Sequence, residues 1–260
     1  MTLLFHELKQ GKVSLIIWSA VLSFMLAVCV IIYPEMSGQM DEASEMLSNM
    51  GSFSEAFGMD QINFGEFIGY FGIECGNVLG LGGAVFAAIL GCSVIAKEEK
   101  EKTAEFLLTH PIRRSTVLTQ KLLSVTLQTV IMNLAVMLVT LASVLLIGEE
   151  VNTKIILIFL SYLLMQLQVL FVSFCISSFS IRGGLGIGIG VSIGSYFVNI
   201  LSNLTDELEM LKYITPFAYT DSGYIIENNS LDIKYILIGA CICAAAIAVS
   251  YIKYSKKDIS

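Results

Sequence analysis

Long apolar stretches alternate with short polar ones along the whole chain. Six of them approach or exceed the roughly 20 residues that a helix needs to cross a membrane; they cover residues 13–33, 68–95, 122–147, 155–179, 183–201 and 233–252. The first ends at Tyr33-Pro34-Glu35 without the small-residue cleavage site of a signal peptide, so we expect it to remain as an anchor. The pattern predicts an all-α polytopic membrane protein with six transmembrane helices.

The polar stretch after the first span is acidic and rich in methionine. Residues 34–66 contain no Lys or Arg. Apolar residues recur there every three or four positions, at Met36, Met40, Ala43, Leu47 and Met50, which predicts an amphipathic helix lying on the outer membrane surface. The role of the Met-rich segment 36–59 is open. Thioethers bind Cu(I), but no Cys or His accompanies these methionines, which favours packing over a copper site.

Small residues repeat at helical spacing in spans two and five. Gly72, Gly76 and Gly80 fall every four residues and continue into Ala84 and Ala88. In span five one face carries Gly186, Gly190 and Gly194, and an adjacent face carries Gly184, Gly188 and Ser192. Such ridges let helix backbones approach closely in a membrane, so we expect both spans to pack tightly against a neighbour.

Isolated polar residues inside the spans have structural and functional interpretations. Glu74, near the outer end of span two, either faces a water-filled cavity or lies among the lipid headgroups. For four amides packing between helices is favoured over substrate contact; they are Gln128, Asn133, Gln166 and Gln168. The six cysteines match no disulfide or zinc spacing and are interpreted as small apolar helix residues, so no metal site is predicted.

One long charged island separates two apolar spans, and we call residues 97–121 the charged segment. Lys97 and Glu101 lie four residues apart, as do Glu98 and Lys102, so each pair lies along one helix face. The apolar group Phe106-Leu107-Leu108 follows before Pro111, and proline disfavours helix at the residue before it. A basic return through Arg113, Arg114 and Lys121 leads into the next span. The segment predicts a short amphipathic helix that offers a docking surface.

The distribution of charge predicts the orientation. The whole chain of 260 residues is 55% apolar with a net charge of −7, but its charges are sorted along the sequence. With both termini cytoplasmic, the outer side holds only Lys154, Lys212 and Lys234, and every other Lys or Arg of the chain's 15 lies inside. This positive-inside bias places the charged segment in the cytoplasm.

The charged segment resembles a known family signature. The residues Glu98-Glu99, Lys102-Thr103-Ala104-Glu105-Phe106-Leu107-Leu108, Pro111, Arg113, Leu118 and Lys121 are similar to E-E-x-x-G-T-x-E-x-L-L-x-x-P-x-x-R-x-x-x-L-x-x-K, with Lys102 in place of the common glycine. This signature is typical of ABC-2-type permeases, the membrane subunits of ATP-binding-cassette transporters. The segment around Pro216 resembles the short outer segment that these permeases carry before their last span, so the resemblance covers nearly the whole chain.

The resemblance implies one transmembrane domain over residues 1–260, with a cytoplasmic coupling helix between spans two and three. The implied partners are ABC ATPase subunits, a second permease half in a homo- or heterodimer, and membrane lipids. The residues implied in ATPase coupling are Glu98, Glu99, Thr103, Glu105, Phe106, Leu107, Leu108, Pro111 and Arg113. Those implied in helix packing or the transport pathway are Gly72, Gly76, Gly80, Gly186, Gly190, Gly194 and Glu74.

Chemistry that the sequence lacks fits this interpretation. No G-x-x-x-x-G-K-[ST], H-E-x-x-H or G-x-S-x-G pattern occurs, and neither His6 nor His110 has an obvious catalytic partner. We therefore expect no enzyme activity and no bound cofactor in this chain, with ATP and Mg on the partner ATPase, and no nucleic-acid partner. The predicted location is the plasma membrane, with multiple passes.

The predicted function is the permease subunit of an exporter that moves an amphipathic substrate, such as a peptide antibiotic or a lipid, outward. The substrate class rests on analogy with relatives alone. Alternative interpretations are a non-transporting scaffold or sensor with the same fold, or a permease serving copper-enzyme maturation. An intramembrane enzyme has no active-site constellation to support it.

Overall fold

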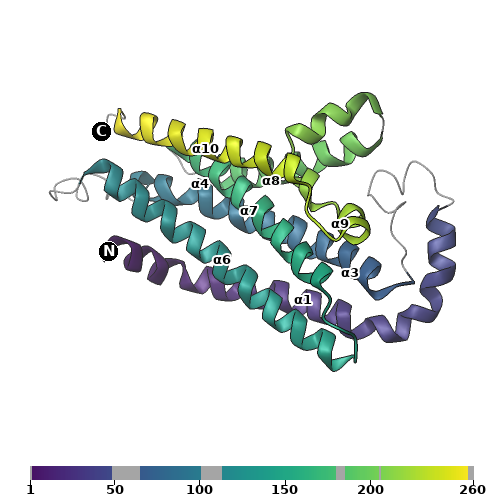
Figure 1. Cartoon of the computed structure of the whole chain (residues 1–260). Coiled ribbons are helices and arrows are strands. Elements are labelled where there is room, and N and C mark those ends of the chain that lie inside the picture. The colour runs from purple at the N-terminus through teal and green to yellow at the C-terminus, as the bar shows by residue number, and fades with distance from the viewer. Residues whose placement is uncertain (1, 49–64, 101–112, 180–184, 205, 257–260) are drawn as a thin grey trace.

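Helices joined by short turns make up the part of the chain that the computed structural model describes, which is residues 2–48, 65–100, 113–179, 185–204 and 206–256. They are α1 (Thr2–Ser48), α3 (Phe67–Cys75), the π-helix η1 (Gly76–Gly83), α4 (Ala84–Lys100), α6 (Arg114–Leu146), α7 (Thr153–Phe179), α8 (Leu185–Leu204), the 3-10 helices η2 (Asp206–Tyr213) and η3 (Pro216–Thr220), α9 (Ser222–Asn228) and α10 (Ile233–Ser255). No strand occurs in these ranges, which confirms the all-α fold class (Figure 1).

Six helices among the described residues are long and apolar enough to cross a membrane. They are Leu3–Gly38, Phe67–Lys97, Arg114–Leu146, Thr153–Phe179, Gly186–Leu204 and Ile233–Ser255. Each corresponds to one predicted span, but the first and third begin several residues earlier than predicted, since Lys, Arg and Gln are good helix formers. Hydropathy therefore located all six spans but missed the polar first turns of the first and third.

Helix α1 continues past the point where the first span was expected to end. Pro34 lies inside the helix, which runs on to Ser48, and proline in a helix interior removes one backbone hydrogen bond and bends the axis. Figure 1 shows the last turns of α1 directed away from its long first part. The predicted amphipathic helix at residues 36–50 is thus helical up to Ser48 as an extension of α1. The side chains at 39–48 and all of residues 49–64 lie outside the described residues, so the Met-rich stripe stays a prediction.

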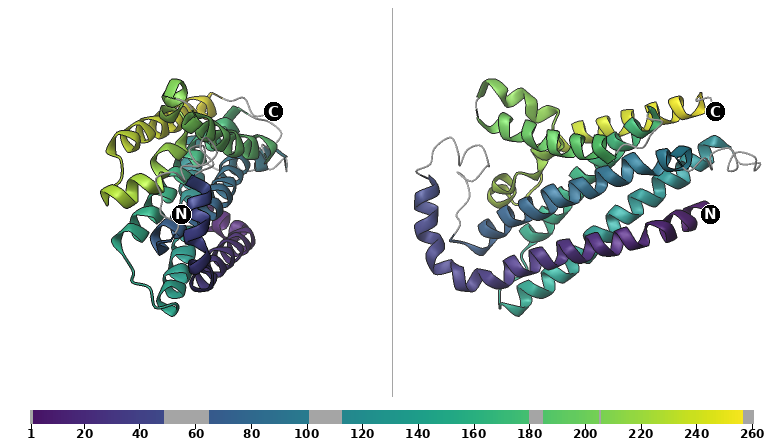
Figure 2. Two further views of the ribbon diagram at one scale, coloured as in Figure 1. Left: turned by 90° about the vertical axis from the view of Figure 1, so that its right-hand side faces the viewer. Right: turned by 180° about the vertical axis from the view of Figure 1, so that it is seen from behind.

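Both termini lie at the same end of the bundle, as the two further views also show (Figure 2). The C-terminal end of α4 and the N-terminal end of α6 lie at that end too. The opposite end carries α3, α9 and the turn between α6 and α7. There Gly148 adopts a positive φ of 83° just after α6, and its N–H donates to the Leu145 carbonyl at 3.2 Å. This left-handed residue ends the helix and begins the turn that leads to α7.

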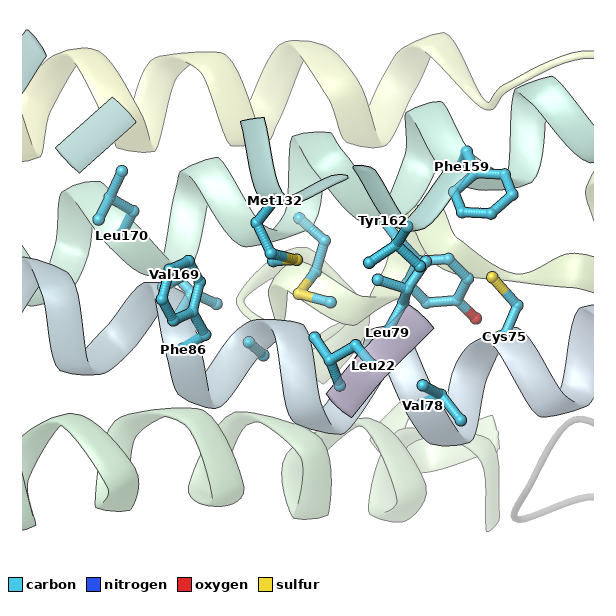
Figure 3. Packing of buried hydrophobic residues seen from close by; sticks show 14 of the residues in the cluster. Leu22, Cys75, Val78, Leu79, Phe86, Met132, Phe159, Tyr162, Val169 and Leu170 are labelled. Carbon is cyan, nitrogen blue, oxygen red and sulfur yellow. The ribbon is translucent and has the colours of Figure 1, made fainter. Parts of the chain in front are cut away.

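The apolar core lies between α1, η1, α4, α6 and α7. Leu22 of α1, Phe86 of α4 and Met132 of α6 converge there on the Tyr162 and Val169 side of α7 (Figure 3). The second span is the central one, because 67% of its most apolar window is buried, against 17% for α8 and 11% for α10. The last two spans are therefore peripheral in the single chain.

The segment between α8 and α10 folds back against α7. Thr215 caps η3 by accepting a hydrogen bond from the Phe217 N–H at 3.3 Å, and Pro216 occupies the first position of that helix. The Tyr219 hydroxyl lies within hydrogen-bond distance of Gln168 and of the Leu164 carbonyl, both in α7. Burial raises the pKa of Tyr219 well above its usual value, so the hydroxyl keeps its proton and acts as the donor.

Candidate functional site at the base of the charged segment

The structure describes the two ends of the charged segment. Glu98 and Glu99 belong to the last turn of α4, but their side chains are not described. The residues predicted to contact an ATPase between these ends lie outside the described residues; they are Thr103, Glu105, Phe106, Leu107, Leu108 and Pro111. Arg113 is exposed and precedes the first turn of α6, where the Thr116 N–H donates to its carbonyl at 2.9 Å. The coupling role of all these residues stays a prediction.

A buried ion pair lies at this base. The Lys121 ammonium of α6 is fully buried, and its Nζ lies 3.1 Å from Oε1 of Glu7 in α1. The same Nζ donates to the Val94 carbonyl of α4 at 2.7 Å. Glu7 is only 8% exposed. One ammonium therefore joins the three helices that surround the two ends of the charged segment.

A second contact joins α1 to α4 one helical turn away. The Lys97 ammonium donates to the Gln10 side-chain oxygen. Glu7 and Gln10 are three residues apart on α1, and Val94 and Lys97 are three apart on α4, so each pair shares a helix face. We call Glu7, Gln10, Val94, Lys97 and Lys121 the base cluster.

Helix α10 holds the other side of α6. The Arg114 guanidinium donates to the Ser255 carbonyl at 3.4 Å, and the Thr119 and Tyr251 hydroxyls lie 2.6 Å apart. The first and last helices of the chain thus both contact the start of α6.

The base cluster was largely missed by the sequence analysis. Lys121 was counted as an inner-side charge and as the end of the family signature, and Glu7 was given no role. The available signal was weak: Glu7 is the only acidic residue before Glu35. Glu7 and Lys121 are 114 positions apart. No local sequence pattern therefore predicts that they are buried together.

The glycines of span two lie against neighbours in the same chain. A Cβ at Gly72 would lie 2.8 Å from that of Ser222, one at Gly76 would lie 3.0 Å from the Tyr162 hydroxyl, and one at Gly80 would lie 3.4 Å from the same ring. Further along, Gly91 approaches the α7 backbone at Leu170. At these glycines the second span therefore lies close to its neighbours in the same chain. A role of these glycines between two permease halves stays a prediction.

A polar network crosses the bundle beside these glycines. Gln166 of α7 donates to the Leu79 carbonyl of η1 at 3.1 Å and accepts from the Asn133 amide of α6 at 2.6 Å. A π-helix forms i→i+5 hydrogen bonds, and such turns are often found at functional sites. The predicted interhelical bonding is confirmed for Asn133, Gln166 and Gln168, whereas the amide group of Gln128 donates within its own helix, to Ser124.

The two glycine faces of α8 have different surroundings. A Cβ at Gly188 would lie 2.9 Å from the Ala88 carbonyl of α4, and Ser192 on the same face is buried. Added Cβ atoms at Gly186, Gly190 and Gly194 would meet nothing within 4 Å among the described residues. No described residue covers the face that carries these three glycines.

Glu74 is half-buried beside α1. Its carboxylate lies 3.5 Å from the Cys29 thiol, and the neighbouring Tyr70 hydroxyl donates to the Cys29 carbonyl at 3.1 Å. These contacts bring Glu74 against the first span.

These features define a class: a polytopic helical membrane protein with six apolar spans and a charged segment between the second and third. The chain belongs to the ABC-2 transporter family, since the profile described as ABC-2 family transporter protein matches residues 1–259. A comparison with curated proteins finds no match. Members of this family are the membrane components of ABC transporters, usually without an ATPase site of their own, and the family implies an ABC ATPase partner. The chain is a multi-pass membrane protein.

Proposed function

We propose that the chain is the permease subunit of an ABC exporter located in the plasma membrane with both termini in the cytoplasm. It moves an amphipathic substrate outward, driven by ATP that a separate ATPase subunit hydrolyses with Mg. The observation that carries the proposal is the family match over residues 1–259. No P-loop pattern occurs in the sequence, so the phosphate-binding machinery has to come from a partner.

The charged segment is the proposed contact with the ATPase. Its charged first half steers and orients association, since charges at the rim of an interface act mainly in this way. Phe106, Leu107 and Leu108 supply the anchor, because large buried side chains at the centre of an interface carry most of its energy. The contacts of Lys97 and Lys121 support this proposal, since they brace both ends of the segment against other helices.

The uncovered glycine face of α8 supports a second permease half as partner. Gly186, Gly190 and Gly194 leave room for a helix to approach closely, as small residues do in membrane helix pairs. The space beside the corresponding glycines of span two is already filled by Ser222 and Tyr162. The proposed interface therefore uses α8 rather than the Gly76 side of the second span.

Reconstitution of the permease with its ATPase in vesicles tests the function. We expect substrate-stimulated ATP hydrolysis and outward transport, whereas a scaffold or sensor would show neither. The variant Phe106→Ala with Leu107→Ala should release the ATPase or abolish transport, while the permease still inserts. Loss of one interface hot spot costs about 2 kcal/mol or more, which is roughly a thirtyfold weaker complex.

The matched control is Leu145→Ala with Leu146→Ala. These residues form an exposed apolar pair at the other end of α6, so their loss removes similar bulk without touching the charged segment. If the Phe106/Leu107 variant transports and binds its ATPase normally, the charged segment is only a surface anchor. A wild-type complex that never transports would overturn the proposed function itself.

A further inference from the structure

The Lys121 ammonium lies where the ends of α1, α4 and α6 meet. Two of its partners come from other helices: the Glu7 carboxylate at 3.1 Å and the Val94 carbonyl at 2.7 Å. Lys121 is inaccessible to solvent, and Glu7 is nearly so. Val94 lies only three residues before Lys97, where the charged segment begins. Lys121 is the last residue of that segment, and its bond to Val94 therefore brings the two ends of the segment together.

Stability alone does not explain this pair. A buried ion pair loses hydration on both partners, and replacing both with apolar residues of similar size is often neutral or stabilising. What a pair of this kind adds is one defined arrangement, because a carboxylate and an ammonium without their partners are strongly disfavoured in a buried site. A sliding movement of α1 past α6 would separate the two charges. The pair therefore resists relative movement of these helices more than apolar packing would.

We infer that Glu7 and Lys121 are positioning residues that hold α1, α4 and α6 together at the base of the charged segment, so that a displacement of the segment moves all three helices as one unit. The inference rests on the proposed function, because it presumes that an ATPase displaces the segment. Neither residue touches substrate or nucleotide in this assignment. Their contribution is to the efficiency with which ATP hydrolysis is converted into transport.

The test is the variant Glu7→Gln with Lys121→Met in the complete permease–ATPase complex reconstituted in vesicles. It removes both charges of the Glu7–Lys121 pair at once. We expect normal assembly with the ATPase and continued ATP hydrolysis, with substrate transported per ATP reduced roughly 2- to 30-fold, the range for substitutions along a coupling route. A purely structural pair would leave this ratio unchanged in the variant that assembles.

The matched control breaks a different contact of the same helix. Thr119→Val removes the hydrogen bond from α6 to Tyr251 of α10, two residues from Lys121 and at an exposed site. We expect this variant to keep the wild-type ratio of transport to hydrolysis. A fall in that ratio as large as in the double variant would show that any disturbance at the start of α6 uncouples the complex, and would overturn the specific role of the pair.

The outcomes separate this inference from the proposed function. If the wild-type complex and the double variant transport equal amounts of substrate per ATP, the inference is wrong and the proposed function stands. If the double variant does not assemble, Glu7→Gln alone replaces it, since Lys121 still donates to Val94 there. Failure of both variants to fold would make the pair a folding requirement and would overturn its role in coupling. A wild-type complex without coupling overturns both the function and the inference.

Discussion

Gln166 joins three helices through a single side-chain amide. It bonds to the Leu79 carbonyl and to Asn133, and it is fully buried. We expect Gln166→Leu to lower the free energy of unfolding by about 1 to 2 kcal/mol, at the upper end for interhelical hydrogen bonds in membranes, because two such bonds are lost together. Unfolding of the purified permease in mixed micelles, followed by circular dichroism, measures the change.

The matched control is Gln128→Leu. Gln128 is 3% exposed, and its amide group donates to the Ser124 carbonyl of its own helix, so its replacement breaks no hydrogen bond between helices among the described residues. We expect a smaller effect there. Equal losses for the two substitutions would mean that the Gln166 network does not hold the helices together.

Residue chemistry was only partly predictable from the sequence. The amides Asn133, Gln166 and Gln168 were expected to bond between helices, and they do, because a polar group in an apolar span has few other ways to be satisfied. The Glu7–Lys121 pair was not predicted. A lysine at the end of a span is normally read as a solvated charge, and only the packing of α1 against α6 makes it a buried one.

Spans two and five carry similar glycine ridges but use them differently, which gives a prediction at the level of elements. We expect Gly76→Leu to destabilise the subunit by about 1 to 3 kcal/mol, the usual cost of overpacking, because the Tyr162 hydroxyl would lie 3.0 Å from the new Cβ. Gly190→Leu should leave the subunit folded and lower the fraction of paired permease halves. Unfolding measurements and cross-linking of the purified complex separate the two effects.

Gly38→Leu is the control for the second substitution. Gly38 is likewise helical and has open space around an added Cβ, but it belongs to α1. We expect it to change neither folding nor pairing. Unchanged pairing in Gly190→Leu would rule out the α8 face as the interface between halves.

The elements of the second span show why a spacing rule has limits. A repeat of four assumes an α-helix throughout, but residues 76–83 form a π-helix with more residues per turn. Beyond Gly80 the glycines that approach α7 are Gly83 and Gly91, and neither continues the repeat of four that links Gly72, Gly76 and Gly80. A π-turn depends on partners such as Gln166 that come from elsewhere in the chain, so the sequence of the span alone does not predict it.

The orientation of the whole molecule stays a prediction that labelling can test. The structure places both termini at one end and α9 at the other (Figure 1). In a background without the six native cysteines, a cysteine at Asn228 in α9 should react with an impermeant reagent from outside. One at Lys256 after α10 should react only after permeabilisation, because the positive-inside bias puts it in the cytoplasm. Both positions are exposed.

The opposite labelling pattern would reverse the topology. It would place the charged segment outside, where no cytoplasmic ATPase reaches it, and the proposed coupling would fail. Labelling of both positions from outside would instead mean that α10, the one predicted span between them, does not cross the membrane.

At the scale of the whole molecule, the sequence was informative about the spans and silent about their neighbours. Continuous apolar runs identified all six membrane-length helices, because the hydrocarbon core imposes length and composition directly. Which helices pair is decided by shape and by contacts distant in sequence. The extensive pairings of α1 with α6 and of α4 with α7 could not be predicted from spans of such similar composition.

These pairings have a consequence for how the protein is made. Because α1 packs on α6 and α4 packs on α7, neither pair forms until the ribosome has delivered the later helix. Glu7 leaves the ribosome 114 residues ahead of Lys121, so its carboxylate has to wait at the hydrated membrane surface for its counter-ion. During synthesis the first two spans are therefore without their final partners. An insertion factor or chaperone would assist this chain most at that stage.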